Sequence, residues 1–269
     1  MSTPGQGTSI TTSRFTAARR CVSDIALLAR EIPLFPVERT MQLAPLAAAR
    51  ADAAARIGWA AIFLKAYATV AIEMPVLRTW LVHGLFGGLS RLATCSESVA
   101  TLAVNRVEQG EDRLFWARLA RPDALPLQEI QQFVADCTTK SVEEVFKRQL
   151  ELEMVPGFLR RTILRWNMNS FSKKRAARIG TFSLSTLAGM GATNRFHPTI
   201  CTTSLSYSPL AADGLCLVTL IADHRVLDGA AAARALARLE EVLVGDVVRE
   251  LRGLSAVTTP VAHHRTAAA

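Results

Sequence analysis

The stretch LIADHRVLDGAAAARALARLEEVL, residues 220–243, carries the clearest structural signal in this chain. An apolar run leads to His224, and an alanine-rich segment follows Gly229. A short apolar run favours a buried strand, and alanine-rich sequence with apolar residues three and four apart favours a helix. The stretch therefore predicts a strand, a tight connection that holds the histidine, and a helix from Ala230 to about residue 244.

His224 and Asp228 allow two interpretations. A histidine that directly follows a buried strand is held by packing, and its ordinary pKa lets it accept a proton at neutral pH, as a general base must. Asp228 is expected to cap the following helix, and Gly229 to supply a backbone conformation closed to other residues. Alternatively, His224 is a core histidine satisfied by a backbone carbonyl, and Asp228 is only a helix cap. Spacing alone leaves both open.

Composition bounds the class of protein. The chain has 269 residues, 50% of them hydrophobic, and a net charge of +8. This length and apolar content suit a folded soluble protein with one α+β domain. The charge suggests an anionic partner such as a phosphorylated ligand, nucleic acid or an acidic membrane surface. The sequence shows no nucleic-acid-binding motif, so nucleic acid is not expected.

The cysteines and the N-terminus point to the cytoplasm. Five widely separated cysteines without a CxxC pair predict neither a disulfide framework nor a metal site. The polar N-terminus, MSTPGQGTSITTS, does not have the form of a secretory signal. The most apolar stretch, residues 57–72, is shorter than the roughly 20 residues of a spanning helix and contains Lys65, so we expect a buried helix there.

Periodicity predicts an α+β order of elements. Helices are expected at 14–30, 43–56, 57–72 and 125–154, a short strand at 37–43, a hairpin of strands at 98–107 and 113–120, and three strands within 180–189, 199–208 and 214–222. Residues 74–90, with their proline and glycines, are expected to be irregular.

Residues 147–178 form a basic helical segment. They hold nine Lys or Arg against two acids, with apolar residues interleaved; the basic residues are Lys147, Arg148, Arg160, Arg161, Arg165, Lys173, Lys174, Arg175 and Arg178. Such a segment lies on an anionic membrane, faces a phosphate-bearing ligand, or is only the solvated face of an ordinary helix. Membrane contact through Arg160, Arg161 and Arg165 is one of these alternatives.

Two motifs resemble a known family. DHRVLDGAAAARAL, residues 223–236, resembles the HxxxDG active-site signature of the acyltransferase (E2) catalytic domain of 2-oxoacid dehydrogenase complexes, which shares a fold family with chloramphenicol acetyltransferase. GTFSLSTLAGMG, residues 180–191, is similar to that family's strand and turn upstream of the histidine. Fainter similarity in the same order, at residues 17–35, 63–80 and 102–107, extends the resemblance over residues 14–251.

The resemblance implies a fold, and the polar composition of both ends suggests where the domain begins and ends. The fold is α+β, a chloramphenicol acetyltransferase-like two-layer sandwich of a mixed sheet packed with helices. Residues 1–13 are expected to be a flexible lead, 14–252 the catalytic domain with 147–178 as a basic helical insert, and 253–269 a disordered tail.

The resemblance also implies a reaction. The chain is expected to be an enzyme, an acyltransferase that moves groups other than amino-acyl groups between a CoA thioester and a thiol or hydroxyl acceptor. His224 would deprotonate the acceptor, Ser185 would donate a hydrogen bond to the oxyanion, and Asp228 would order the active-site loop. The family forms trimers in which the histidine of one chain faces the serine of the next, so a homotrimer or a multiple of trimers is expected.

Departures from the family leave the acceptor open. The sequence has no lipoyl domain, so the acceptor is expected to be a lipoyl domain of another protein or a small molecule. An acyl-CoA is expected as substrate, with no bound cofactor and no metal. A second hypothesis is a catalytically inactive trimeric scaffold that binds a partner, or a membrane peripherally, through residues 147–178.

Overall fold

The computed structural model describes residues 10–84 and 88–256. Its centre is a six-stranded mixed sheet, in which only the pairs on either side of β6 are parallel. In spatial order the strands are β1 (Leu34–Gln42), β8 (Leu215–Asp223), β7 (Thr203–Tyr207), β6 (Phe182–Leu184), β4 (Val99–Glu108) and β5 (Glu111–Ala120). The hairpin of β4 and β5 confirms the predicted one, and Gln109 and Gly110 make its turn with positive φ values of 54° and 81°.

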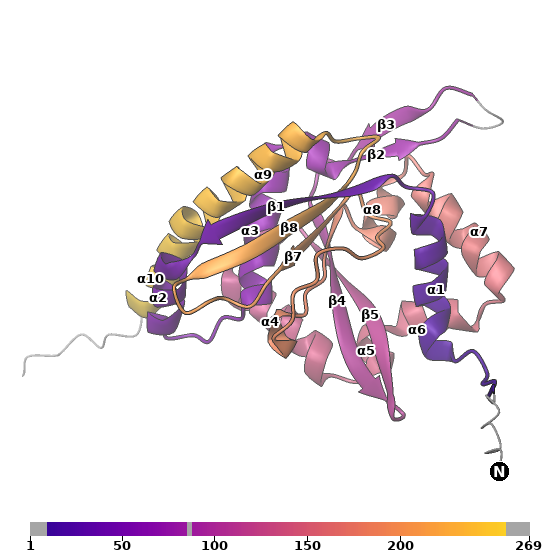
Figure 1. The fold of residues 1–269 in the computed structure, drawn as a ribbon, viewed down its shortest axis with the longest axis horizontal. Helices are drawn as coiled ribbons and strands as arrows, with labels where there is room; N and C mark the ends of the chain where they lie inside the picture. Colours follow the sequence, from indigo (N-terminus) through magenta and orange to yellow (C-terminus); the bar gives the residue numbers. More distant parts are fainter. Residues whose placement is uncertain (1–9, 85–87, 257–269) are drawn as a thin grey trace, which may run out of the picture.

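Helices from both halves of the chain cover one face of the sheet (Figure 1). Two of them, α3 (Trp59–Glu73) and α9 (Gly229–Val242), pack directly on the strands. They are joined there by α2 (Ala44–Asp52), α4 (Leu127–Thr139), a π-helical turn at Leu243–Val247 and α10 (Val248–Ala256). Together the sheet and these helices form the predicted two-layer sandwich.

The main core lies between these two layers. The Tyr67 ring packs 4.8 Å from that of Phe182, its hydroxyl donates to Thr203 Oγ1 at 2.8 Å, and Phe63 stacks on Tyr207 at 4.2 Å. Helix α3, predicted as a buried helix, therefore lies inside the protein. Within the described residues no helix has both the length and the apolar character needed to cross a membrane.

A second, smaller core lies beside β5. It is built from α1 (Ala17–Ala29), α7 (Gly157–Met168) and α8 (Lys173–Ile179), and its buried residues include Leu28, Leu164 and Ile179. Short helices α5 (Val142–Val145) and α6 (Lys147–Met154) connect α4 to α7. Figure 1 shows this group at the side of the sheet away from α9 and α10.

Helix α6 protects the open edge of the sheet. Gln149 Nε2 donates to the Leu114 carbonyl at 3.0 Å, and Gln149 Oε1 accepts from the Trp116 amide at 3.1 Å. An unpaired edge strand otherwise offers its backbone groups to other chains. The basic segment therefore has a structural function in closing the fold.

Residues 74–90 were expected to be irregular, and for part of this segment that prediction is wrong. After a 3-10 turn at Pro75–Arg78, β2 (Thr79–Val82) pairs with β3 (Arg91–Thr94) in a separate two-stranded sheet. Four residues are too few for a clear alternation, and the strand is held by a tertiary contact, because Thr202 Oγ1 donates to the Thr79 carbonyl at 2.5 Å. Residues 85–87 lie outside the described residues.

Gly180 is needed where α8 turns into β6. Its φ is 94°, and a Cβ at this position would lie 2.3 Å from Thr101 Oγ1. Only glycine combines this backbone conformation with such a close approach. The glycine that opens the predicted GTFSLSTLAGMG motif is thus required by packing.

The last described helix, α10, ends at Ala256. Most of the expected lead and tail, residues 1–9 and 257–269, lies outside the described residues.

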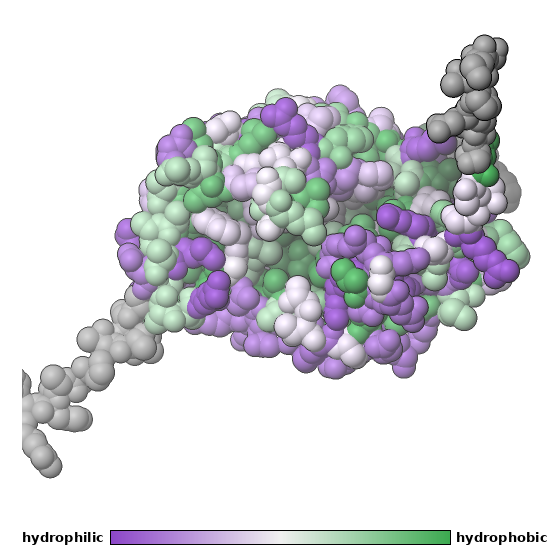
Figure 2. Space-filling view, turned by 60° about the horizontal axis from the view of Figure 1, so that its bottom comes forward, coloured by the Kyte–Doolittle hydropathy of each residue, from purple (hydrophilic) through white to green (hydrophobic). Residues whose placement is uncertain are grey.

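On the face shown in Figure 2, polar residues surround a central hollow that is lined by apolar and neutral ones. The surface there mixes both kinds of residue.

Candidate active site

His224 stands at the end of β8 with its ring exposed. Its amide donates to the Pro33 carbonyl at 3.0 Å, which ties the residue to the start of β1. The ring packs 4.5 Å from that of Phe35 and makes no hydrogen bond to any described residue. The alternative of a core histidine satisfied by a carbonyl is therefore wrong. The imidazole nitrogens are available to a ligand or to another chain.

The turn that carries His224 is fixed by its two neighbours. The buried Asp223 carboxylate accepts from Arg225 Nε at 2.9 Å, from Arg225 Nη2 at 2.8 Å and from the Arg225 amide at 3.0 Å. A forked guanidinium-carboxylate pair of this kind restrains geometry more than a single contact does. Sequence reasoning gave no role to Asp223, although the opposite charges in DHR were a signal.

Asp228 caps α9, as predicted. Its backbone is extended, with φ of −97° and ψ of 169°, and its Oδ1 accepts from the Ala231 amide at 2.7 Å. The prediction for Gly229 is wrong. This glycine is the first helical residue, its φ is not positive, and a Cβ there would meet nothing within 4 Å. Because Asp228 makes the turn from loop to helix, no special conformation is needed at the next residue.

Ser185 directly follows β6. Its amide donates to the Leu205 carbonyl at 3.0 Å, so its backbone is held in register with the sheet. The residue is partly buried, and its hydroxyl makes no hydrogen bond within the described part of the chain. Thr186 closes the turn, since its Oγ1 donates to the Tyr207 carbonyl at 2.8 Å. The serine hydroxyl is thus free to donate to a ligand.

Strand register separates His224 from Ser185 in one chain. Leu184 lies level with Leu205 and Leu220, so Ser185 lies level with Thr219. His224 is therefore about 16 Å further along the sheet and about 10 Å across it, from a rise of about 3.3 Å per residue and a strand spacing of about 4.8 Å. These two side chains cannot act on one reacting group within a single copy.

A second histidine and serine lie in direct contact, which the sequence did not reveal. His197 Nε2 lies 2.7 Å from Ser204 Oγ, and Ser183 Oγ donates to Ser204 Oγ at 2.6 Å. Burial lowers the pKa of His197 to about 4, so the ring is neutral near pH 7. Ser204 is completely buried, so it is not accessible to a substrate. This polar chain joins β6, β7 and the loop before β7.

The basic segment divides into buried and exposed residues. Arg160 is only 5% exposed and pairs with Asp24 on α1, and Arg175 is 3% exposed. Arg160 therefore cannot contact a membrane, so the alternative of membrane contact is wrong for this residue. The outer face of α7 instead carries Phe158, Ile163 and Trp166, of which Trp166 is 75% exposed. Beside Leu164 the helix thus buries polar groups, and its outer face exposes large apolar ones.

Comparison with known proteins shows the fold. No protein-family model and no curated protein matches the sequence, but solved structures match over nearly the whole chain. The fold is that of the catalytic cores of 2-oxoacid dehydrogenase complexes, and the predicted fold class is confirmed.

Three structures illustrate the match. A truncated catalytic core of the 2-oxoacid dehydrogenase multienzyme complex from Thermoplasma acidophilum has a TM-score of 0.63 and 15% identity, and the match covers 88% of this chain and 99% of that one. Azotobacter vinelandii dihydrolipoamide acetyltransferase has a TM-score of 0.61 and 18% identity, with 92% and 96% covered. The cubic core of the pyruvate dehydrogenase multienzyme complex has a TM-score of 0.61 and 19% identity, with 92% and 96% covered.

Proposed function

We propose that the chain is a CoA-dependent acyltransferase with His224 as its general base. The observation that carries this proposal is the exposed imidazole at the end of β8, without a hydrogen-bond partner among the described residues, in the fold of acyltransferase catalytic cores. A serine, a histidine and an asparagine have been studied in the mechanism of the Azotobacter vinelandii enzyme. Ser185 and His224 supply the first two residue types here.

The reaction follows from these two groups. His224 takes the proton from a thiol or hydroxyl acceptor, and the resulting anion attacks the thioester carbonyl of an acyl-CoA. The carbonyl oxygen becomes an oxyanion, to which the Ser185 hydroxyl donates a hydrogen bond. When the tetrahedral intermediate collapses, the thiolate of CoA leaves and takes up the proton from the imidazolium. The acyl group then resides on the acceptor, and His224 is neutral again.

The separation of His224 from Ser185 supports an active site shared between copies. His224 and Ser185 must both reach the same carbonyl group during the reaction. Within one chain they cannot, because His224 lies five residues along the sheet from the position level with Ser185. A closed ring of identical chains brings the histidine of one copy to the serine of the next. We therefore propose a homotrimer or a multiple of trimers, and the similarity to a cubic core of a multienzyme complex supports assembly of this kind.

The substrates are proposed by chemical class. An acyl-CoA brings phosphate groups to a chain of net charge +8, which is favourable electrostatically. The acceptor is a lipoyl domain of another protein or a small thiol or alcohol. Five free cysteines suit a reducing compartment, so we place the reaction in the cytoplasm.

Mixed assemblies test the proposal. Wild type should transfer acyl groups from at least one member of an acyl-CoA panel to dihydrolipoamide or another thiol. His224→Ala should lose this activity, and Ser185→Ala should lower kcat by about 10²- to 10³-fold. The two variants should then be co-expressed so that they assemble together. Roughly one quarter of the shared sites should pair an intact histidine with an intact serine, so roughly one quarter of wild-type activity should return. Activity that is equal in wild type and His224→Ala would falsify the proposal.

A second candidate function is docking on an anionic membrane through α7. The outer face of this helix exposes Phe158, Leu159, Ile163 and Trp166, and residues 154–212 contain no Asp or Glu. Exposed aromatic and aliphatic residues beside Arg and Lys suit the interface of anionic lipids. The flanking cations are Arg161, Arg165, Lys173 and Lys174. Of these, Arg161 pairs with Asp24 and Arg165 with Glu31.

Vesicle flotation tests this second candidate. Wild type should float with vesicles of phosphatidylglycerol and phosphatidylcholine but not with phosphatidylcholine alone. The double variant Phe158→Ser/Trp166→Ser should not float with the vesicles. Val107 is an exposed apolar residue on the β4–β5 hairpin, and Val107→Ser should float as wild type does. Equal flotation of the α7 variant and wild type would exclude α7 as the membrane-binding surface, and catalytic activity should be the same in both.

A further inference from the structure

A cavity of about 40 Å³ lies where the basic helices meet the end of β8. Its lining includes Trp80 and His83 from the β2–β3 region, Arg165 and Asn169 from and just after α7, and Arg175 from α8. By the criterion that one water needs about 10–15 Å³, it has room for about three waters or one small anion. Asp223 and Arg225 line it, while His224 and Ser185 do not.

Arg175 brings a buried charge to this cavity, and no carboxylate among the described residues is in ion-pair contact with it. Its guanidinium is stacked 4.4 Å from the centre of the Trp80 ring and donates to the Gly180 carbonyl at 3.1 Å and the Ile200 carbonyl at 3.5 Å. Its Nε makes no hydrogen bond, and no ion pair joins it to any described carboxylate. A guanidinium has five N–H donors, so three of them have no hydrogen-bond partner among the described residues.

Burial makes this charge costly. The desolvation of Arg175 lowers the pKa of its guanidinium to about 10, but the group is still cationic at neutral pH. A buried charge without a counter-ion strongly destabilises a folded protein. An anion in the cavity would offset this cost.

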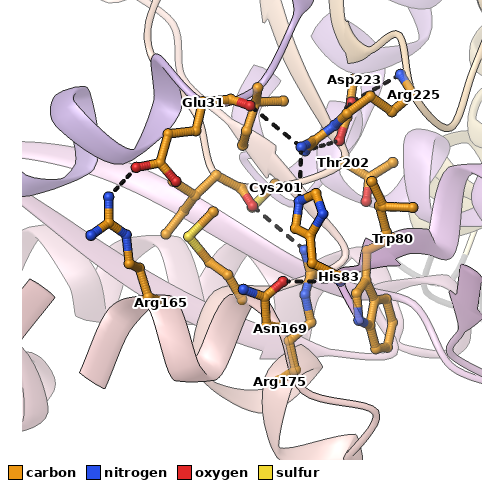
Figure 3. Close-up of a pocket in the computed structure, with 14 residues that line it drawn as sticks. Glu31, Trp80, His83, Arg165, Asn169, Arg175, Cys201, Thr202, Asp223 and Arg225 are labelled. Atoms are coloured by element: carbon orange, nitrogen blue, oxygen red, sulfur yellow. Dashed lines mark hydrogen bonds and ion pairs between the residues drawn. The ribbon is translucent and has the colours of Figure 1, made fainter. Parts of the chain in front are cut away.

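The acids around the cavity are already paired. Glu31 accepts from Arg165, and Asp223 accepts from both Nε and Nη2 of Arg225. Three arginines and two acids are among the described lining residues, so the arginines outnumber the acids by one. Figure 3 shows the side chains of Arg225 and Arg175 on either side of His83.

Asn169 adds a neutral donor at the rim. Its Oδ1 accepts from the His83 amide at 3.4 Å, which leaves its Nδ2 without a partner among the described residues. Figure 3 shows Asn169 beside His83, on the same side of the cavity as α7. Arg175 and Asn169 thus both line a cavity whose two acids are already paired.

We propose that this cavity, here named the Arg175 pocket, binds a small oxyanion, the phosphate or carboxylate group of a ligand. The proposal does not depend on the acyl-transfer mechanism, because neither His224 nor Ser185 lines the pocket. The oxyanion supplies the acceptors that Arg175 and Asn169 lack and neutralises the excess charge. A phosphate of CoA, a free phosphate and a carboxylate ligand share this chemistry.

Calorimetric titration with inorganic phosphate tests the proposal. At constant ionic strength, wild type should bind phosphate saturably, and Arg175→Gln should weaken binding by at least about tenfold, because the buried cation is lost. Asn169→Asp should weaken phosphate binding by a similar factor. Aspartate has nearly the same shape as asparagine, but it brings a negative charge to this exposed position. Lys174→Gln removes an exposed charge on the same helix outside the pocket and should bind as wild type does.

Competition identifies the source of the oxyanion. If CoA displaces phosphate from wild type and 3′-dephospho-CoA does not, the pocket holds that phosphate of CoA. If acetate binds more tightly than phosphate, the pocket holds a carboxylate. Because Asn169 is exposed, Asn169→Asp keeps the test valid even if Arg175→Gln does not fold. No saturable binding of either anion to wild type, or equal binding by wild type and both pocket variants, would overturn the proposal, and neither result depends on acyltransferase activity.

Discussion

The carboxylate of Asp24 on α1 and the guanidinium of Arg160 on α7 form an ion pair inside the smaller core, with side chains only 4% and 6% exposed. Arg160 also donates to the Val155 carbonyl at 3.0 Å. These contacts, together with the burial of Leu164, hold one face of α7 against α1. The buried pair therefore contributes to the orientation of α7, in which Phe158 and Trp166 are exposed.

Removal of one partner of this pair should destabilise the protein. Asp24→Ala leaves Arg160 charged and buried, and we expect the free energy of unfolding to fall by about 3–5 kcal/mol in urea denaturation. Glu31→Ala breaks the exposed pair of Glu31 with Arg165, and it should cost less than about 1 kcal/mol. Similar losses for the two variants would show that burial of the Asp24 pair contributes little.

The hydrogen bond by which Asp228 caps α9 should stabilise the protein whether or not the side chain is charged. Asp228→Ala removes the acceptor for the Ala231 amide and should lower the free energy of unfolding by about 1 kcal/mol. Asp228→Asn keeps an oxygen acceptor at the N-cap and should unfold close to wild type. If the asparagine variant instead unfolds like the alanine variant, charge and not capping is the contribution of this residue.

The burial of His197 should make the free energy of unfolding depend on pH. Its pKa is about 4 in the folded protein, against an ordinary value near 6.5, so below pH 6.5 the unfolded chain takes up a proton that the folded chain does not. The free energy of unfolding should therefore fall as the pH is lowered from 6.5 to 4, by roughly 3 kcal/mol from this residue. His197→Gln does not titrate. Denaturation at pH 7 and pH 4.5 should show a smaller loss for this variant, and parallel losses would contradict the assignment.

Gly180 should not tolerate a side chain. Gly180→Ala places a methyl group against Thr101 Oγ1 at a φ of 94°, and we expect a loss of more than about 2 kcal/mol in unfolding free energy. Gly253→Ala provides the matched control, because it lies in α10 with nothing within 4 Å of an added Cβ. That variant should be neutral or slightly more stable. Equal stability of the two variants would mean that the backbone at residue 180 can relax.

Most of the fold could be predicted from local patterns. The strands β4, β5, β7 and β8 and the helices α1, α3 and α9 follow apolar periodicity closely enough that their positions were foreseen. The short pair β2 and β3 was not, because four-residue strands have too little pattern and depend on contacts such as that of Thr202 with the Thr79 carbonyl. Gly229 was misjudged because Asp228 already makes the turn into α9.

The candidate site was predicted in part. His224 and Asp228 lie where a strand and a helix meet, which is a local feature of sequence, and their placement was correct. The contact of His197 with Ser204 and the pairing of Asp223 with Arg225 were not foreseen. The first depends on a loop folding over the sheet, and no periodic pattern encodes that.

The sequence alone determined the order of helices and strands, the histidine at the end of β8 and the excess of positive charge. Those properties follow from apolar spacing and composition, which act over a few residues or over the whole chain. Only the tertiary structure decided which charges are buried, that Arg175 lacks a counter-ion among the described residues, and that His224 and Ser185 stand far apart in one copy. Burial and strand register arise when segments distant in the sequence pack together. Local sequence patterns therefore do not determine them.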